Sequence, residues 1–243
     1  MAIEIKQLTK AFGPIVAIDD LNLTIKDNEL FGLLGVNGAG KTTTIKTICC
    51  LMKPTSGDAL VNGHSILEKD GENAIKEIIN LSPQDTSVAQ NLTVRENLQL
   101  IAGIYGLDKE KGASNIEKVI NDFNLDEVKD RKAKTLSGGW QRRLSIAMAL
   151  VTEPKVLFLD EPTLGLDVLA RRELWQAIKS LKSRMTIVLT THYLEEAEHL
   201  CDRIAIMAKG KLMALGTADE LKKLAGVDDF EEAFIKIAGG ETL

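Results

Sequence analysis

The sequence predicts an α/β protein: a mixed sheet with flanking helices, an N-terminal antiparallel β subdomain and an inserted α-helical subdomain. Three observations predict this fold class. Strand-like apolar patterns cluster toward both ends of the 243-residue chain. The middle segment has helical apolar spacing and few strand formers. A glycine-rich turn separates a short apolar run from the first turns of a helix. We expect one domain over 1–225, an inserted helical subdomain at 92–150 within it, and a short tail at 226–243.

The beginning of the chain is predicted to be mostly strand, because apolar residues alternate with polar ones or form short continuous runs. These predicted strands lie at 1–10, 16–25, 30–34, 57–61 and 78–82. Asn62-Gly63 predicts a hairpin turn. A helix is expected to follow the glycine-rich turn, over 43–48.

The inserted segment is predicted to hold three helices. Thr93-Val94-Arg95-Glu96 has the pattern of a capping box, so a helix is expected to begin there. Strand patterns resume after the insertion, at 156–160, 187–189, 204–207 and 212–215. Apolar residues at i, i+4 and i+7 mark a helix between the first two of these strands. Thr217-Ala218-Asp219-Glu220 is expected to cap a final helix.

The most specific local pattern is Gly35-Val36-Asn37-Gly38-Ala39-Gly40-Lys41-Thr42, which fits Gly, any four residues, then Gly-Lys-Ser/Thr. Glycines let the backbone approach an anion, and the helix that continues through Thr43 would direct its N–H groups at a β-phosphate. Lys41 would reach the β- and γ-phosphates, and the Thr42 hydroxyl would bind Mg²⁺. A chance match would occur in roughly 1 in 100 chains of this size, so the rest of the chain has to decide.

A second candidate segment is the apolar run at 156–159, which ends in Asp160-Glu161. In open α/β sheets, ligands bind at the carboxyl ends of the strands. Asp160 would hold Mg²⁺ as a Walker B acid does, and Glu161 could polarise an attacking water. A solvated Asp-Glu turn is the alternative, and the phosphate loop upstream favours the functional interpretation.

A third segment, Leu136-Ser137-Gly138-Gly139-Trp140, stands directly before a predicted helix. Ser137 could simply be an N-cap. Two glycines near a helix start would each destabilise it by about 1 kcal/mol relative to Ala, so capping alone does not explain them. Exposed N–H groups at a helix N-terminus form an anion site, so the sequence predicts a second phosphate-binding segment here.

Composition limits the other possibilities. The net charge is −5 and only 4% of residues are aromatic, so we expect no nucleic-acid partner. The three cysteines lack a pairing framework or metal spacing, which predicts reduced thiols in the cytosol. No signal-peptide pattern is found at the start, and no apolar run approaches the ~18 residues of a membrane span. Any work at a membrane would need another chain.

Together these motifs resemble the ATP-binding cassette (ABC) family of transporter ATPases, over nearly the whole chain. The order is specific: a phosphate loop, Gln84 after a strand, Leu-Ser-Gly-Gly, Asp160-Glu161, Gly165-Leu166-Asp167 and Thr191-His192. The segment 192–198 looks most like the drug, sodium and antibiotic exporter branch. The resemblance implies a P-loop NTPase core.

The resemblance also implies residue roles. Gln84 matches the Q-loop glutamine, which touches Mg²⁺ or the attacking water; a plain loop residue is the alternative. Asp167 matches the D-loop acid, and it could also cap the next helix. His192 matches the switch histidine that contacts the γ-phosphate. Phe12 stands where an aromatic residue stacks on adenine, although it could equally be a core residue. Trp140 departs from the family, which usually has Gln, Glu or Met there, and this puts the fit at the subunit interface in doubt.

The expected function is an ATP-hydrolysing subunit that powers export of an unidentified substrate through a separate membrane permease. The resemblance implies that Ser137 and Gly139 complete the ATP site of a second subunit, identical or closely related. We expect the chain to be cytoplasmic and peripheral on the inner face of the cell membrane. A soluble cassette ATPase in cluster assembly, repair or translation is the alternative. A nucleotide-binding regulator without hydrolysis is a third, disfavoured by Glu161 and His192.

Overall fold

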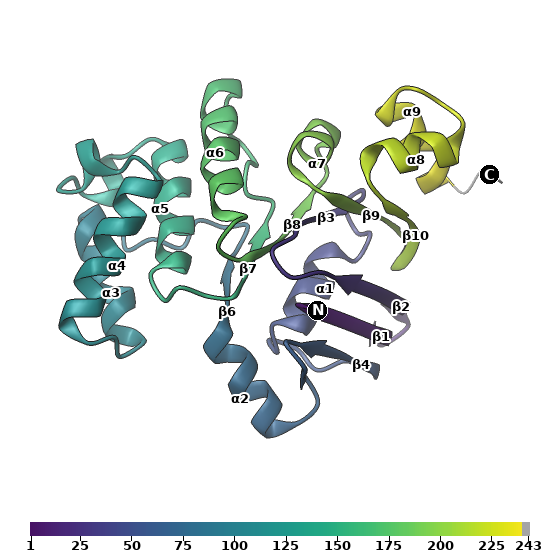
Figure 1. Ribbon diagram of the computed structural model, residues 1–243, viewed down its shortest axis with the longest axis horizontal. Helices are drawn as coiled ribbons and strands as arrows, with labels where there is room; N and C mark the ends of the chain where they lie inside the picture. Colours follow the sequence, from purple (N-terminus) through teal and green to yellow (C-terminus); the bar gives the residue numbers. More distant parts are fainter. Residues whose placement is uncertain (240–243) are drawn as a thin grey trace.

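The protein, described here for residues 1–239 in a computed structural model, is built around two sheets (Figure 1). The first is a six-stranded sheet in the order β10 (Lys211–Gly216), β9 (Arg203–Ala208), β3 (Leu30–Leu34), β8 (Thr186–Thr191), β7 (Val156–Asp160), β6 (Ile79–Ser82). Its strands are parallel except β10, which pairs antiparallel with β9. Every residue of β3, β7 and β8 is buried, as expected for central strands covered on both faces.

The second sheet is antiparallel and has four strands, in the order β2 (Ile15–Ile25), β1 (Ile3–Phe12), β4 (Ser56–Val61), β5 (His64–Ser65). The predicted turn at Asn62-Gly63 joins β4 to β5, and both residues have positive φ, 48° and 84°. Helix α1 (Lys41–Ile48) lies between the two sheets (Figure 1). One apolar cluster fills this layer, with side chains from both sheets and from α1.

The remaining helices lie around the six-stranded sheet. They are α2 (Lys69–Ile78), α3 (Val94–Ile104), α4 (Lys109–Asp122), α5 (Gly138–Leu150), α6 (Val168–Leu181), α7 (Leu194–Leu200), α8 (Ala218–Ala225) and α9 (Phe230–Gly239). Helices α3, α4 and α5 form a group at one end of the molecule, and α8 and α9 lie at the other (Figure 1). Thr93 makes the predicted capping box at α3, and Thr217 makes the one at α8. The predicted fold class is confirmed.

Three α-helices have no counterpart in the sequence-based prediction. Helix α2 precedes β6, α7 lies between β8 and β9, and α9 follows α8, which was expected to be the final helix. Phe230, Ala233 and Ile237 of α9 are buried in a cluster with residues of α7, α8 and β9. Residues 226–239, expected as a tail, therefore contain a packed helix.

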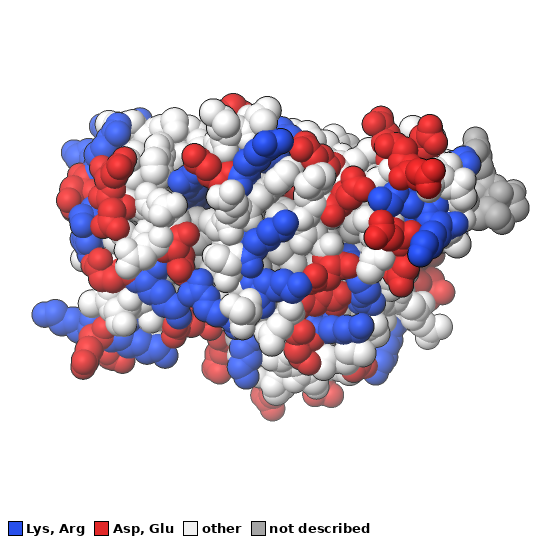
Figure 2. Space-filling view, turned by 45° about the horizontal axis from the view of Figure 1, so that its top comes forward, with Lys and Arg blue, Asp and Glu red and all other residues white. Residues whose placement is uncertain are grey.

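One face of the molecule has mixed charge. Acidic and basic side chains are interspersed over the face drawn in Figure 2. Within residues 1–239, no helix combines the length and the apolar character needed to cross a bilayer.

Candidate functional site

A cleft of ≈ 650 Å³ lies where the turn between β1 and β2, the loop after β3 and the ends of β7 and β8 meet. Most of the sequence-predicted site residues line it. They are Phe12, Asn37, Gly38, Ala39, Gly40, Lys41, Thr42, Thr43, Gln84, Glu161 and His192. The carboxyl ends of the parallel strands thus form one wall, as the rule for open sheets predicts.

The loop between β3 and α1 needs its glycines. Gly40 has φ 100°, and a Cβ on it would lie 2.3 Å from the carbonyl oxygen of Ala17. A Cβ on Gly35 would lie 2.4 Å from the carbonyl oxygen of Met207. The backbone can therefore curl tightly at this point only without side chains. Helix α1 begins without a side-chain cap and without an acidic residue in its first turn, so its N-terminal amides keep their partial positive charge.

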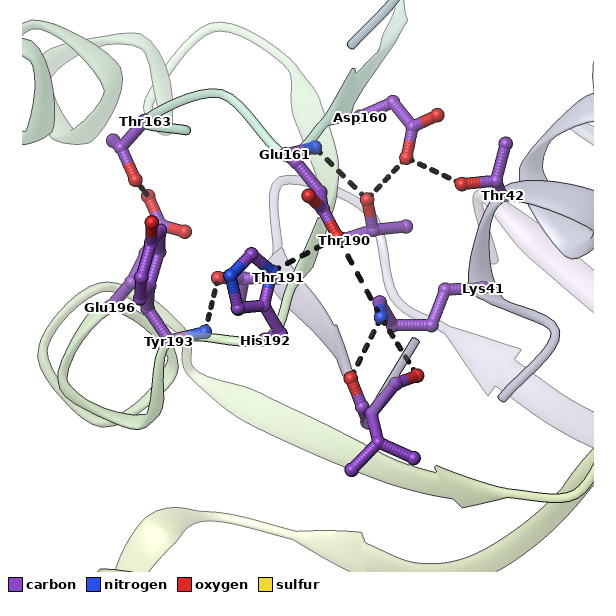
Figure 3. Close-up of polar contacts among 12 residues, drawn as sticks. Lys41, Thr42, Asp160, Glu161, Thr163, Thr190, Thr191, His192, Tyr193 and Glu196 are labelled. Carbon is purple, nitrogen blue, oxygen red and sulfur yellow. Dashed lines mark hydrogen bonds and ion pairs between the residues drawn. The ribbon is translucent and has the colours of Figure 1, made fainter. Parts of the chain in front are cut away.

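Lys41 is buried at the floor of the cleft, with 5% of its side chain exposed. Its Nζ donates to the carbonyl oxygens of Gly35 at 2.7 Å and Val36 at 3.3 Å. The same atom lies 3.8 Å from Glu161 Oε1 (Figure 3). Burial lowers the pKa of Lys41, while the nearby carboxylates of Glu161 and Asp160 act to raise it. Phosphate oxygens could replace the two carbonyl oxygens as acceptors of the Lys41 ammonium, and these charge-assisted hydrogen bonds would be stronger.

Asp160 ends β7 beside the hydroxyls of two threonines. Its Oδ1 accepts from Thr42 Oγ1 at 3.0 Å and from Thr190 Oγ1 at 2.5 Å (Figure 3). A carboxylate next to a hydroxyl fits Mg²⁺, which uses one or two protein oxygens together with waters and substrate phosphates. No group of three or more His, Cys, Asp and Glu residues in the described part of the chain could hold a metal by itself.

Glu161 points into the cleft from an unusual backbone conformation. Its φ is 47°, in the left-handed region that L-residues rarely adopt. Its N–H donates to the carbonyl oxygen of Thr190 at 3.1 Å and to the Thr190 hydroxyl at 3.0 Å, which holds this conformation. Its Oε1 lies 3.1 Å from His192 Nδ1 (Figure 3). A carboxylate paired with a histidine can accept and orient a proton.

Gln84 and Phe12, whose roles the resemblance implied, also line the cleft. Gln84 follows β6, and Phe12 ends β1 at the cleft mouth with 48% of its surface exposed. Lys10 Nζ lies 5.0 Å from the centroid of the Phe12 ring. A half-exposed ring at a cleft mouth can stack on a flat ligand, and its exposure disfavours the alternative of a core residue.

The segment 136–140 lies elsewhere. Ser137 is the N-cap residue of α5 but makes no side-chain cap bond, and none of the five residues lines the cleft. Leu136 is buried, whereas a Cβ on Gly138 would meet no heavy atom within 4 Å. The ring of Trp140 lies 4.8 Å from the guanidinium of Arg143 and lines a separate groove against α6.

Asp167 caps α6. Its Oδ1 accepts from the N–H groups of Leu169 at 3.0 Å and Ala170 at 2.9 Å. The alternative role considered for this residue is therefore present in the structure, and its role toward another subunit stays a prediction.

Sequence reasoning missed several residues behind the site. Thr190 lies opposite Asp160 in the register of β7 and β8, and it anchors both Asp160 and the Glu161 amide. Glu196 is buried and accepts from the Thr163 hydroxyl at 2.9 Å and from Trp175 Nε1 at 3.1 Å. The position of Thr190 directly before Thr191-His192 was the available signal, but the strand register is not visible in one sequence.

Comparison with known proteins gives a consistent family assignment. The family model described as "ABC transporter" matches residues 18–164. The probable multidrug ABC transporter ATP-binding protein YbhF of Escherichia coli (strain K12) is 42% identical over 241 residues, covering 97% of this chain and 41% of the relative. The daunorubicin/doxorubicin resistance ATP-binding protein DrrA of Streptomyces peucetius is 39% identical, covering 93% of this chain and 68% of the relative. This chain therefore spans less than half the length of YbhF.

Among solved structures, the dimeric structure of MJ0796, a bacterial ABC transporter cassette, superposes with a TM-score of 0.79 at 27% identity. The match covers 88% of this chain and 98% of MJ0796. The predicted resemblance, including the drug-export branch to which YbhF and DrrA point, is confirmed. The chain belongs to the ABC transporter family.

Proposed function

We propose that this chain is the ATP-binding and ATP-hydrolysing subunit of an ABC exporter of drug-like compounds. One observation carries the ATPase part of the proposal: a buried lysine, a hydroxyl–carboxylate pair and a Glu161–His192 pair meet in a single cleft. These are the groups that phosphoryl transfer to water requires. The names of YbhF and DrrA support the export part.

Each side of the cleft would have its own task. Lys41 and the first amides of α1 would hold the β- and γ-phosphates, and Phe12 would stack on the adenine ring. Glu161 would accept a proton from the attacking water, with His192 orienting the carboxylate and contacting the γ-phosphate. Mg²⁺ bound by Thr42, Asp160 and Gln84 would neutralise charge on the phosphate oxygens.

The proposed working unit is a dimer with a second ATP-binding subunit, either identical or a close paralogue. The start of α5 supports this proposal, because within residues 1–239 the Ser137 hydroxyl makes no cap hydrogen bond and this segment lies outside the cleft of its own chain. Ser137 and Gly139 would contact the γ-phosphate bound by the partner. The dimeric structure of the MJ0796 cassette is consistent with such an arrangement.

The proposed permease contact lies beside Gln84. Leu100 and Ile104 of α3, and Tyr105 directly after it, are exposed apolar or aromatic side chains. Tyr105 borders a groove that also contains Leu81, Pro83 and Met148. Exposed apolar groups next to a groove mark an interaction surface. We propose that a helix of the permease binds this surface, which would hold the chain at the cytoplasmic face of the membrane.

The central test is ATP hydrolysis by the purified chain, compared with its Glu161→Gln variant. We expect turnover to fall by about 10²–10⁴, the range for loss of a general base, while ATP binding persists and ATP-bound dimers accumulate. Glu153→Gln, which changes a carboxylate paired with Lys118 at 2.8 Å, is the matched control. Unchanged turnover in Glu161→Gln would remove the proposed role of that residue.

A separate experiment tests the transport part. We expect the chain to co-purify from membranes with a polytopic membrane protein. Charged substitution of Ile104 should release it without reducing hydrolysis by the isolated chain. An active ATPase that never associates with membranes would favour the soluble-cassette alternative.

A further inference from the structure

Arg142 is a buried cation whose hydrogen-bond partners are all main-chain carbonyl groups. It lies in α5, one turn beyond Gly138, and only 3% of it is exposed. Its Nε donates to the carbonyl oxygen of Pro162 at 2.8 Å and its Nη2 to that of Asp160 at 2.9 Å. Its Nη1 donates to the carbonyl oxygens of Pro83 and, at 3.3 Å, Gln84.

These four carbonyls belong to two chain segments, and no backbone–backbone hydrogen bond joins the two segments to each other. The parallel pairing of β6 with β7 ends at Ser82 and Leu159. The segments continue as Pro83–Gln84 on one side and Asp160–Pro162 on the other. The planar guanidinium of Arg142 bridges these two segments just beyond the point where the pairing of β6 with β7 ends. Only arginine offers several donors in one rigid plane, so the contact specifies geometry as well as attraction.

The charge on Arg142 persists under ordinary conditions. Burial lowers its pKa to about 10, and the carboxylates of Asp160 and Glu196 act to raise it. The group therefore stays protonated at neutral pH. Within residues 1–239, Arg142 forms no ion pair, whereas the next residue, Arg143, pairs with Glu173. A charged guanidinium bound to carbonyls makes stronger hydrogen bonds than a neutral donor would.

We propose that Arg142 is a positioning residue. It holds the segment Pro83–Gln84 against the segment Asp160–Pro162 and connects both to α5. The proposal rests on the function proposed above. If the start of α5 contacts the partner's nucleotide, Arg142 links that contact to the residues that serve the chain's own nucleotide. No step of the reaction passes through Arg142 itself.

The first test separates positioning from general stability. Arg142→Gln and Arg142→Lys are compared with Arg143→Gln, the same change one residue later. We expect turnover per nucleotide site to fall at least about tenfold in Arg142→Gln, while equilibrium ATP affinity stays within about threefold. Arg142→Lys keeps the positive charge but loses the planar set of several donors, so its turnover should lie between those of Arg142→Gln and the parent chain. Arg143→Gln should hydrolyse ATP like the parent chain.

The second test reads the two segments directly, by amide hydrogen exchange in the full chain. In Arg142→Lys, residues 84–87 and 163–167 should both exchange faster than in the parent, whereas Arg143→Gln should match the parent. This measurement decides the matter if Arg142→Gln does not fold.

Three results would overturn the proposal: unchanged exchange in both segments, unchanged turnover in Arg142→Gln, or affinity and turnover that fall by the same factor. If the parent chain hydrolyses no ATP, the proposed function fails, while the exchange result still judges the role of Arg142.

Discussion

The N-termini of α1 and α5 share a feature that the other α-helices in the described residues lack. Each begins next to glycine, without a side-chain cap bond and without an acidic residue in the first turn. Every other α-helix in the described residues has a side-chain cap or an acidic first turn. Both starts therefore keep unpaired amides and a positive helix end, the combination that favours an anion.

The two starts differ in what surrounds them. At α1, Lys41 is buried and the chain itself supplies Asp160 and Glu161 nearby. At α5, a Cβ on Gly138 would meet no heavy atom within 4 Å, and none of residues 136–140 lines the cleft that holds Lys41 and Glu161. The first start is thus part of a preformed cleft, and the second is available to another molecule. This contrast underlies the proposed dimer.

Lys41→Ala should give the largest effect, because it removes the only lysine that lines the cleft within residues 1–239. We expect ATP affinity to fall by at least about 100-fold, which corresponds to about 2.7 kcal/mol. Equilibrium titration with a fluorescent ATP analogue measures this change. Lys46→Ala, an exposed lysine in the same helix, is the control. Micromolar affinity in Lys41→Ala would contradict the phosphate-loop assignment.

Ser137→Arg should affect the other start without touching the cleft. The long side chain would block the approach of a second subunit, so ATP-dependent dimers should disappear and turnover should fall at least about tenfold. Monomer affinity for ATP should stay within about threefold of the parent chain. Light scattering with and without ATP measures the dimer, and Ser114→Arg, on the exposed face of α4, is the control. Dimers that persist in Ser137→Arg would remove α5 from the interface.

Glu196→Gln should give the smallest effect, visible as a pH dependence of stability. Burial raises the pKa of Glu196 above its ordinary value of 4.5, although hydrogen bonds from Thr191, Thr163 and Trp175 and the charge of Arg171 oppose the shift. A raised folded-state pKa gives stability that is complete below pH 4.5 and is lost as the pH rises through the folded value. Gln cannot titrate, so the variant should gain melting temperature relative to the parent as the pH rises above 4.5.

A differential scan at several pH values checks this prediction, with about 2–4 °C expected for each kcal/mol. A constant difference in melting temperature across the pH range would show that Glu196 keeps one protonation state. Such a result would mean that Glu196 does not titrate within the pH range of the scan, while its contacts with Thr163 and Trp175 would stand.

The sequence predicted the parts of the site that are local in the chain. The loop ending in Lys41 follows β3, Asp160 and Glu161 stand at the end of β7, and His192 follows β8. The parallel sheet brings these strand ends to one edge. Local patterns are enough for such residues because strand, turn and helix signals lie within a few positions of each other.

Contacts between distant segments could not be predicted in the same way. Thr190 meets Asp160 through the register of β7 and β8, and Arg142 reaches residues about sixty positions away at Pro83. Nothing in a single sequence gives strand register or the direction of a buried guanidinium. Helix α9 had a visible signal, since Phe230, Ala233 and Ile237 follow helical spacing, yet the acidic residues between them suggested a tail.

The backbone at Glu161 has a consequence for how this protein can change. A left-handed conformation suits glycine and strains any other L-residue by about 1 kcal/mol or more. The chain nevertheless keeps a glutamate at φ 47° and anchors it through Thr190. Glycine at this position would relieve the backbone strain but would remove the carboxylate that we propose accepts a proton from water. Under that proposal, folding stability and ATP hydrolysis place opposite demands on one residue.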